Sequence, residues 1–219
     1  MKKRGRYKAI GLEAEFETGT RGKVLKNLLR IKKQSELERV ETIALKQAED
    51  KFQELIRRDK HFTAKNICSM HKVWLGNIYE WAGKYRSVDL DKENFRFAHA
   101  RFIPELMESF EKNFLEKHTP CTFHSQEQVI KALAEVHVEL IIIHPFREGN
   151  GRLSRSLATL MALQAGFAPL DFTPIQKGRK KNEYFKAVRA GRDGNCGPME
   201  NIFREIIEKG LSQFPAKYK

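Results

Sequence analysis

The chain has 219 residues, 41% of them hydrophobic and 32% charged, and its formal net charge is +13. This composition predicts a soluble globular protein with a buried core, and no apolar run approaches the roughly 18 residues that a membrane span needs. Cys68, Cys121 and Cys196 have no metal-ligand spacing, and no apolar stretch follows the basic N-terminus, so we expect free thiols, no secretory signal and a cytoplasmic location.

The N-terminal segment carries much of the positive charge. Residues 1–33 contain eleven Lys and Arg residues against three glutamates. A field of this kind favours acidic partners, including nucleic acid, but the segment matches none of the usual nucleic-acid motifs. We therefore predict a basic arm over residues 1–34 that is solvated or docks a partner, and we do not expect it to bind nucleic acid.

Helical spacing of apolar residues is the main pattern from residue 24 onward. It suggests a short helix at 24–31 and a long amphipathic helix at about 35–58. Thr63 is placed to cap a third helix, whose pattern continues to Gly83. Later helices are expected at 104–117, 126–143, 153–164, 183–190 and 199–211.

One region interrupts the helical pattern. Residues 85–90 and 94–98 alternate in side-chain character and flank the polar, turn-like segment 91–93, which predicts a β-hairpin. The sequence therefore predicts an all-α domain over residues 35–212, a bundle around a central helix-loop-helix with one short hairpin, and a tail at 213–219.

The stretch from His144 to Arg155, HPFREGNGRLSR, concentrates polar chemistry between two apolar segments. A helix that starts at about Arg152, after the glycines of 149–151, would point free backbone N–H groups and its positive dipole end at an anion. Glycine also lets the backbone approach phosphate closely. Arg152 and Arg155, one turn apart, are able to bind further phosphate oxygens.

Three more side chains complete this candidate site. His144 can act as a base near neutral pH, Glu148 is a hard ligand suited to Mg²⁺, and Phe146 would anchor the loop in the core. Each feature alone has a simpler explanation, such as a core histidine or a solvated arginine pair. Together in one loop they favour transfer of a phosphorus-containing group from a nucleotide to a hydroxyl of a second substrate.

This stretch resembles the Fic-domain signature, and the similarity extends over roughly residues 35–210. Residues 78–86 and 95–97 look like the segments that precede and form the flap hairpin of that family, and 23–27 look like the lead-in of Fic toxins and cell-filamentation-type proteins. The signature positions are His144, Phe146, Glu148, Gly149, Asn150, Gly151, Arg152 and Arg155.

The resemblance implies an all-α Fic fold and AMP transfer from ATP to a Ser, Thr or Tyr hydroxyl of a target protein. His144 would deprotonate the hydroxyl that attacks the α-phosphate, Glu148 would hold Mg²⁺ between the α- and β-phosphates, and Arg152 would bind the outer phosphates. The groups implied in ATP and phosphate binding are Gly149, Asn150, Gly151, Arg152 and Arg155.

The resemblance also implies a target-binding flap and an adenine pocket. The flap would clamp the backbone of the target protein by strand addition. Its residues would be Asn94, Phe95, Arg96 and Phe97, and those of the adenine pocket Asn182 and Tyr184.

The sequence departs from many Fic proteins in one respect. It contains no Ser/Thr-x-x-x-Glu-Gly/Asn element, whose glutamate pairs in those proteins with the second motif arginine, here Arg155. We expect either a toxin restrained by a separate small antitoxin or an unrestrained enzyme. A degenerate substitute that uses Glu205 or Glu208 is a less favoured alternative to plain surface positions.

Other activities of the same site stay open from sequence. Removal of AMP from a modified target would use the same residues, and a phosphotransferase variant of the fold would replace the Gly-x-Gly-Arg segment, in which Gly151 is retained here. A non-catalytic basic interaction protein is the alternative from a different class, and the intact motif argues against it.

Overall fold

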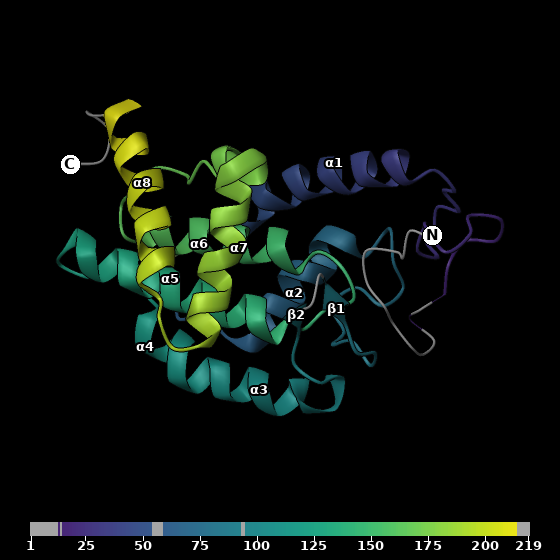
Figure 1. Ribbon diagram of the computed structural model, residues 1–219, viewed down its shortest axis with the longest axis horizontal. Helices are drawn as coiled ribbons and strands as arrows, with labels where there is room; N and C mark the ends of the chain where they lie inside the picture. The colour runs from purple at the N-terminus through teal and green to yellow at the C-terminus, as the bar shows by residue number, and fades with distance from the viewer. Residues whose placement is uncertain (1–12, 14, 54–58, 93–94, 214–219) are drawn as a thin grey trace.

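The computed structural model describes residues 13, 15–53, 59–92 and 95–213, and helices make up most of it (Figure 1). Short 3₁₀ turns lie at Ala100–Phe102 and Thr173–Gln176, and a π-helical turn lies at Glu111–Leu115. The elements follow in the order α1 (Gln34–Gln53), α2 (Ala64–Leu75), β1 (Asp91–Lys92), β2 (Phe95–Arg96), α3 (Ile103–Phe110), α4 (Glu116–His118), α5 (Gln126–Ile143), α6 (Asn150–Gln164), α7 (Gly178–Arg192) and α8 (Gly197–Gln213).

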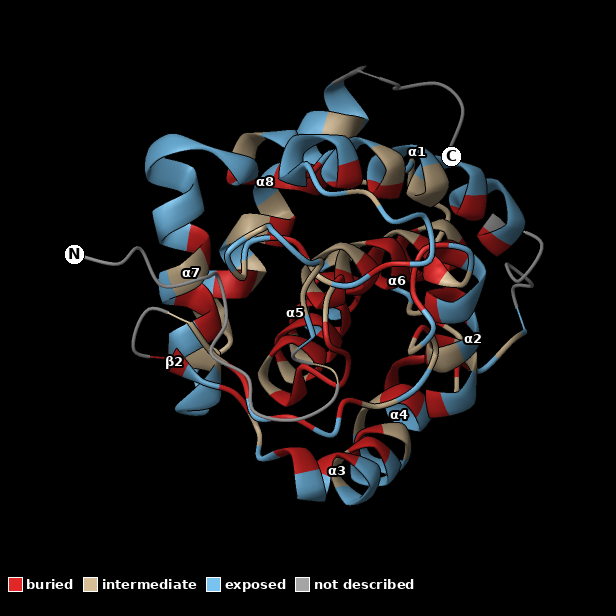
Figure 2. Ribbon diagram, turned by 90° about the vertical axis from the view of Figure 1, so that its right-hand side faces the viewer, coloured by how far each residue is buried: buried red, intermediate tan, exposed pale blue. Residues whose placement is uncertain are grey.

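Helices α5 and α6 form the centre of the molecule. In Figure 2 buried residues gather on this pair, and the other helices, α1, α2, α3, α4, α7 and α8, surround it. Buried side chains cover most of the surface of α5, and its remaining face, with Lys131, Glu135 and Glu139, is exposed or half-buried, as expected for a core helix with one polar stripe. A capping box of Ser125 and Gln128 starts α5, and the helix ends at the predicted Ile143.

Helix α2 begins as predicted, because Thr63 and Asn66 form a capping box. Its end differs from the prediction, since the helix stops at Leu75 and Gly76 caps it. The later apolar residues, including Ile78, are buried in turns instead of on a helix face. The backbone carbonyl of Ile78 accepts a hydrogen bond from Leu28 N–H, 2.9 Å away.

The helix expected at 24–31 is absent from the structure. Asn27 explains the difference, because its side-chain amide donates to the backbone carbonyls of Leu25 and Ile31 and its oxygen accepts from Ile31 N–H. Such local bonds compete with helical ones. Leu25 instead forms an antiparallel bridge with Phe16, and Leu28 is exposed.

The hairpin is present but shifted. Asp91 pairs with Arg96 and Lys92 pairs with Phe95. The first strand therefore occupies residues 91 and 92, where a turn was predicted. The predicted strand at 85–90 pairs with the second segment only at its end, where Phe97 N–H donates to the carbonyl of Leu90, whereas Arg86 N–H donates to the carbonyl of Pro145 in the motif loop.

Several predicted boundaries need separate comment. Helix α6 begins at Asn150, ahead of the expected start, and α7 and α8 both extend beyond their predicted bounds. Residues 54–58, where the first long helix was expected to end, lie outside the described residues, as do residues 1–12 and 14 of the predicted arm and residues 214–219 of the predicted tail. The division into arm, domain and tail stays a prediction.

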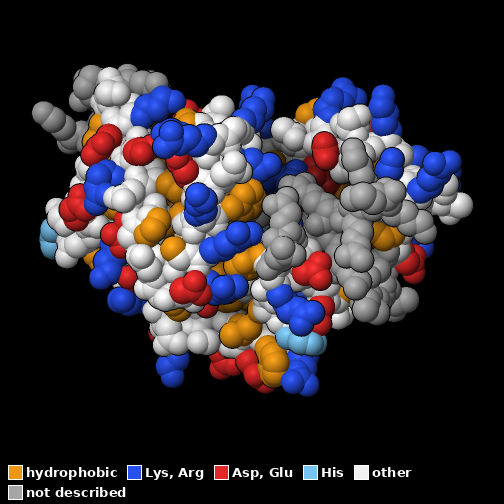
Figure 3. All heavy atoms as spheres, in the orientation of Figure 1, with side chains coloured by type: hydrophobic (Ala, Val, Ile, Leu, Met, Phe, Trp, Pro, Cys, Tyr) orange, Lys and Arg blue, Asp and Glu red, His pale blue; other side chains and the backbone are white. Residues whose placement is uncertain are grey.

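Two properties of the surface bear on partners. Lys and Arg side chains are spread over the face in Figure 3 and alternate with acidic and apolar ones. Within the part of the chain that the structure describes, no helix combines the length and apolar character needed to cross a membrane.

Candidate active site

His144 sits where α5 ends and the motif loop begins. Its backbone is left-handed, with φ 52° and ψ 58°, and the residue is 5% exposed. Nδ1 lies 3.1 Å from the carbonyl oxygen of Ile141, which favours the tautomer with a proton on Nδ1 and a lone pair on Nε2. Phe97 of the hairpin stacks on the imidazole, with ring centroids 3.7 Å apart. The base candidate is therefore covered by the hairpin.

Arg86, whose role the sequence analysis missed, fixes the backbone on both sides of this contact. Its guanidinium is buried and donates to the carbonyls of His144, Val88 and Ala98 at distances of 2.7, 2.6 and 2.6 Å. Val88 and Ala98 flank the hairpin in the chain. One side chain thus joins the hairpin to the end of α5.

The motif loop is anchored by a stack of two buried rings. Phe146 is fully buried and lies parallel to His71 of α2, with centroids 3.9 Å apart. His71 Nδ1 accepts from Gly83 N–H at 2.8 Å, and its Nε2 lies 3.1 Å from the carbonyl of Glu148. Burial lowers the pKa of His71 to about 4, so the ring is neutral near pH 7 and Nε2 donates to Glu148.

The turn between loop and helix needs a glycine. Gly149 has φ +85°, and a Cβ there would lie 2.7 Å from the ring of Trp74. Its N–H donates to the Glu148 carboxylate at 3.1 Å. The loop therefore runs directly over Trp74 of α2.

Asn150 braces the loop through its side chain. Its amide oxygen accepts from Phe146 N–H at 2.8 Å, and its amide nitrogen donates to the Phe146 carbonyl at 2.7 Å. Because α6 begins at Asn150, the early N–H groups of this helix are free of intrahelical partners by geometry. Both polar atoms of the Asn150 amide, in contrast, are engaged with the loop backbone.

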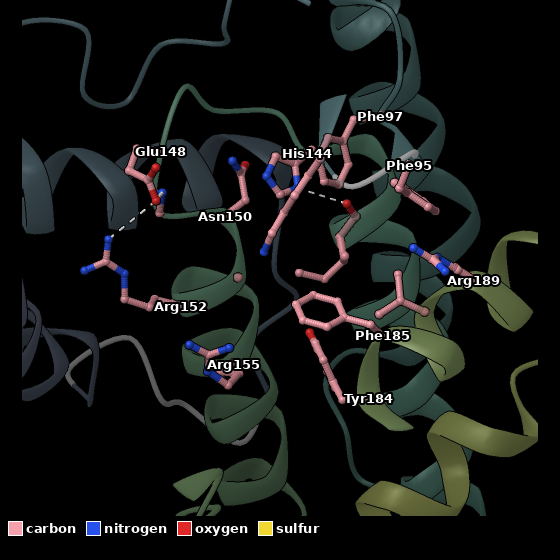
Figure 4. A pocket seen from close by; sticks show the side chains of 15 residues that line it. Phe95, Phe97, His144, Glu148, Asn150, Arg152, Arg155, Tyr184, Phe185 and Arg189 are labelled. Atoms are coloured by element: carbon pink, nitrogen blue, oxygen red, sulfur yellow. Dashed lines mark hydrogen bonds and ion pairs between the residues drawn. The ribbon is translucent and has the colours of Figure 1, made fainter. Parts of the chain in front are cut away.

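The side chains of the two motif arginines of α6 contact different residues. Arg152 Nη2 pairs with Glu41 of α1 at 2.6 Å and lies 3.7 Å from Glu148. Figure 4 shows Arg152 on the side of α6 away from Phe185. Arg155 interacts with the hydroxyl of Tyr184.

A cavity of about 150 Å³ opens between the hairpin, the loop and α7 (Figure 4). Of the two adenine-pocket candidates, Tyr184 lines it, whereas Asn182 is exposed on α7 and does not. Arg96 of the flap is exposed, and Asn94 lies outside the described residues. The lining residues are Lys92, Phe95, Phe97, Ile141, His144, Glu148, Gly149, Asn150, Gly151, Arg152, Arg155, Tyr184, Phe185, Val188 and Arg189.

Sequence reasoning missed Phe185 and Arg189 as lining residues. They are four positions apart and share one face of α7 with Tyr184 and Val188, so helical spacing counted from Tyr184 would have found them. The hydroxyl of Tyr184 lies 2.8 Å from Nε2 of the buried His137 in α5, and this contact fixes the position of the tyrosine ring.

Comparison with known proteins agrees with this geometry. Residues 61–162 match the model of the Fic/DOC family. Over these residues the chain belongs to the Fic/DOC family. The predicted Fic fold, a helical bundle with a short hairpin, is thereby confirmed.

Related Fic proteins carry informative names. The chain is 35% identical to protein adenylyltransferase VbhT of Bartonella schoenbuchensis over 90% of its own length, but spans only 38% of that protein. It is 27% identical to the probable protein adenylyltransferase Fic of Salmonella typhimurium, covering 85% of this chain and 88% of that protein.

Solved Fic structures are also similar. BepC of Bartonella tribocorum, determined with bound AMPPNP, has a TM-score of 0.70 at 25% identity and covers 87% of this chain and 94% of its own. The Fic domain of a cell filamentation protein from Bartonella quintana, with bound ADP, has a TM-score of 0.67 at 25% identity, with 83% and 89% coverage.

Proposed function

We propose that the chain is a protein adenylyltransferase, which transfers AMP from ATP to a Ser, Thr or Tyr hydroxyl of a target protein. The observation that carries this proposal is the complete loop from His144 to Arg155 at the mouth of a cavity bounded by the hairpin and α7. Relatives named as adenylyltransferases, and similar structures that hold AMPPNP or ADP, support it.

His144 is the proposed base. With Nδ1 directed at the Ile141 carbonyl, Nε2 is the atom that removes the proton from the target hydroxyl. That oxygen then forms a bond to the α-phosphorus, the bond to the β-phosphate bridging oxygen breaks, and pyrophosphate leaves. The stacked Phe97 limits the rotation of the imidazole.

The first turn of α6 and the two arginines are proposed to bind the phosphates. Backbone N–H groups of Gly149, Asn150 and Gly151 meet the inner phosphates, where the helix dipole is positive. Arg152 and Arg155 bind the outer ones by charge-assisted hydrogen bonds. In such reactions positioning and charge neutralisation account for most of the catalysis.

The donor set suits a Mg²⁺ ion. The Glu148 carboxylate borders the cavity and its side chain is 16% exposed, and within the described residues no three His, Cys, Asp or Glu side chains gather to enclose a metal. Mg²⁺ is commonly held by one or two carboxylates together with phosphate oxygens and water, so Glu148 would be its protein ligand. When bound, the ion neutralises charge on the α- and β-phosphates.

The hairpin is proposed to hold the target protein. A backbone edge of β1 and β2 beside Phe97 and His144 is suited to pair with an extended segment of the target. Phe95, Arg96 and Phe97, together with Asn94, are the proposed docking residues. Phe95 and Phe97 line the cavity, so the docked hydroxyl would arrive next to His144.

We further propose that the enzyme acts in the cytoplasm and that a separate small antitoxin restrains it. The absence of the internal inhibitory sequence motif supports the proposal of a separate antitoxin. Glu205, considered above as a substitute, pairs with Lys180 on the exposed surface of α7 and α8, which favours a surface role.

The test is transfer of label from adenine-labelled ATP in the presence of Mg²⁺. Wild-type protein should label itself or a protein in a lysate, and His144→Ala should abolish labelling while the protein remains folded. His124→Ala, at an exposed histidine, is the matched control and should label like the wild type. Equal labelling by His144→Ala and the wild type would overturn the proposal.

A further inference from the structure

A buried carboxylate outside the signature touches the nucleotide-binding machinery. The side chain of Glu41, in the middle of α1, is 5% exposed. One of its oxygens accepts from the Tyr79 hydroxyl at 2.5 Å, and the other accepts from Arg152 at 2.6 Å. Its backbone carbonyl accepts from Trp74 Nε1 at 2.9 Å. Glu41 is therefore itself held rigidly by groups of two other segments.

Arg152 is restrained by the same cluster. Its guanidinium lies over the Trp74 ring, with the central carbon 4.6 Å from the ring centroid. Its contacts with Glu41 and Glu148 both run through Nη2. In the described part of the chain, Nε and Nη1 of Arg152 keep their donors for another acceptor, and phosphate oxygens match the guanidinium fork well.

Arg152 lies between two cavities. The cavity described above is on one side, and a second one of about 280 Å³ opens between α1 and residues 16–25 on the other. Glu41 and Tyr79 line only the second cavity, whereas Arg152 lines both. Without Glu41, the guanidinium would lose the contact that fixes its orientation between the two cavities.

We infer that Glu41 is a positioning residue, which holds Arg152 so that Nε and Nη1 meet the outer phosphates of ATP. The inference rests on the proposed function of the site. Arg has high rotamer entropy, and a guanidinium fixed in advance loses less freedom when phosphate binds. Because AMP lacks the outer phosphates, the effect of Glu41 is confined to nucleotides that carry them.

The contact between Glu41 and Arg152 also acts against phosphate binding, and the experiment below distinguishes the two effects. A carboxylate 2.6 Å from the guanidinium also neutralises part of its charge. If neutralisation outweighed positioning, removal of the charge of Glu41 would strengthen ATP binding and increase transfer.

The experiment measures the affinities for ATP and AMP by calorimetry in wild-type protein, Glu41→Gln and Glu38→Gln. Glu38 is the matched control, because it lies on the same helix and lines the same second cavity but is exposed and contacts Gln34. Glu41→Gln should weaken ATP binding about tenfold, as expected for loss of one charge-assisted contact, and leave AMP binding unchanged. Glu38→Gln should match the wild type.

Three results would overturn the inference: an equal loss of ATP and AMP affinity, no change, or tighter ATP binding. Glu41→Asp provides a second variant if Glu41→Gln fails to fold, and it should give a smaller, ATP-selective loss. In an Arg152→Ala background Glu41→Gln should have no further effect on ATP affinity, and a persisting effect would also contradict the inference. A wild type that binds ATP but transfers no AMP would contradict the proposed function alone, because these affinities are measured without transfer.

Discussion

Arg86 Nε donates a hydrogen bond of 2.7 Å to the backbone carbonyl of His144, 58 positions further along the chain. The same guanidinium bonds the carbonyls of Val88 and Ala98 on either side of the hairpin. A carbonyl at the end of α5 has no intrahelical partner, and Arg86 supplies one. The position of the proposed base and that of the flap therefore depend on one buried side chain.

Replacement of Arg86 by Gln should destabilise the fold by about 3 kcal/mol, because several buried carbonyls lose their donor at once. Urea unfolding measures the loss. Arg101→Gln is the control, since Arg101 is exposed and lies over Phe102, and it should change stability by less than about 0.5 kcal/mol. If Arg86→Gln were as stable as the wild type, the carbonyls would be accepting hydrogen bonds from water instead.

Gly149→Ala should impair both stability and AMP transfer. Gly149 and Gly166 have nearly the same backbone angle, with φ +85° and +84°, but only Gly149 has a neighbour in the path of a Cβ. Gly166→Ala therefore reports the cost of left-handed backbone alone, about 1 kcal/mol. Gly149→Ala should cost more than this because Trp74 must move. Equal decreases in unfolding temperature in the two variants would mean that the loop and Trp74 move apart without an energetic cost.

Stability should fall in mild acid because of buried neutral histidines. Burial lowers the pKa of His71 to about 4 and that of His137 to about 3, whereas an unfolded histidine titrates near 6.5. Between pH 6.5 and 4 the unfolded chain thus binds more protons, so the free energy of unfolding decreases as pH falls, by about 1.4 kcal/mol per pH unit for each histidine.

Unfolding curves over this pH window test the assignment to His71. His71→Gln should reduce the slope by about one proton, while His124→Gln, at an exposed site, should leave it unchanged. An unaltered slope in His71→Gln would mean that His71 is not neutral in the folded protein.

Local signals in the sequence predicted the bounds of α5 and the start of α2, because capping residues and apolar spacing act within a few positions. The loop chemistry was equally local. The supporting residues were not predictable in this way: Glu41 lies 111 positions from Arg152, and His71 lies 77 from Glu148. Nothing in the sequence separates a charged residue that will be buried against a distant partner from an exposed one, so the sequence did not single out Glu41.

Glu148→Gln should reduce AMP transfer by a larger factor at low Mg²⁺ concentration than at high concentration. The amide keeps the size of the side chain but is a weaker ligand for a hard cation. Initial rates over a Mg²⁺ titration measure the shift, with Glu38→Gln as the control. A dependence on Mg²⁺ identical to that of the wild type would exclude Glu148 as the protein ligand.

The most direct test of the central claim compares two preparations of ATP, one labelled at the α-phosphate and one at the γ-phosphate. Wild-type protein should transfer label to protein from α-labelled ATP only, and His144→Ala should transfer none from either preparation. AMP transfer retains the α-phosphate and releases the other two as pyrophosphate. Label acquired from γ-labelled ATP, or equal α-label in the wild type and His144→Ala, would contradict AMP transfer by this site.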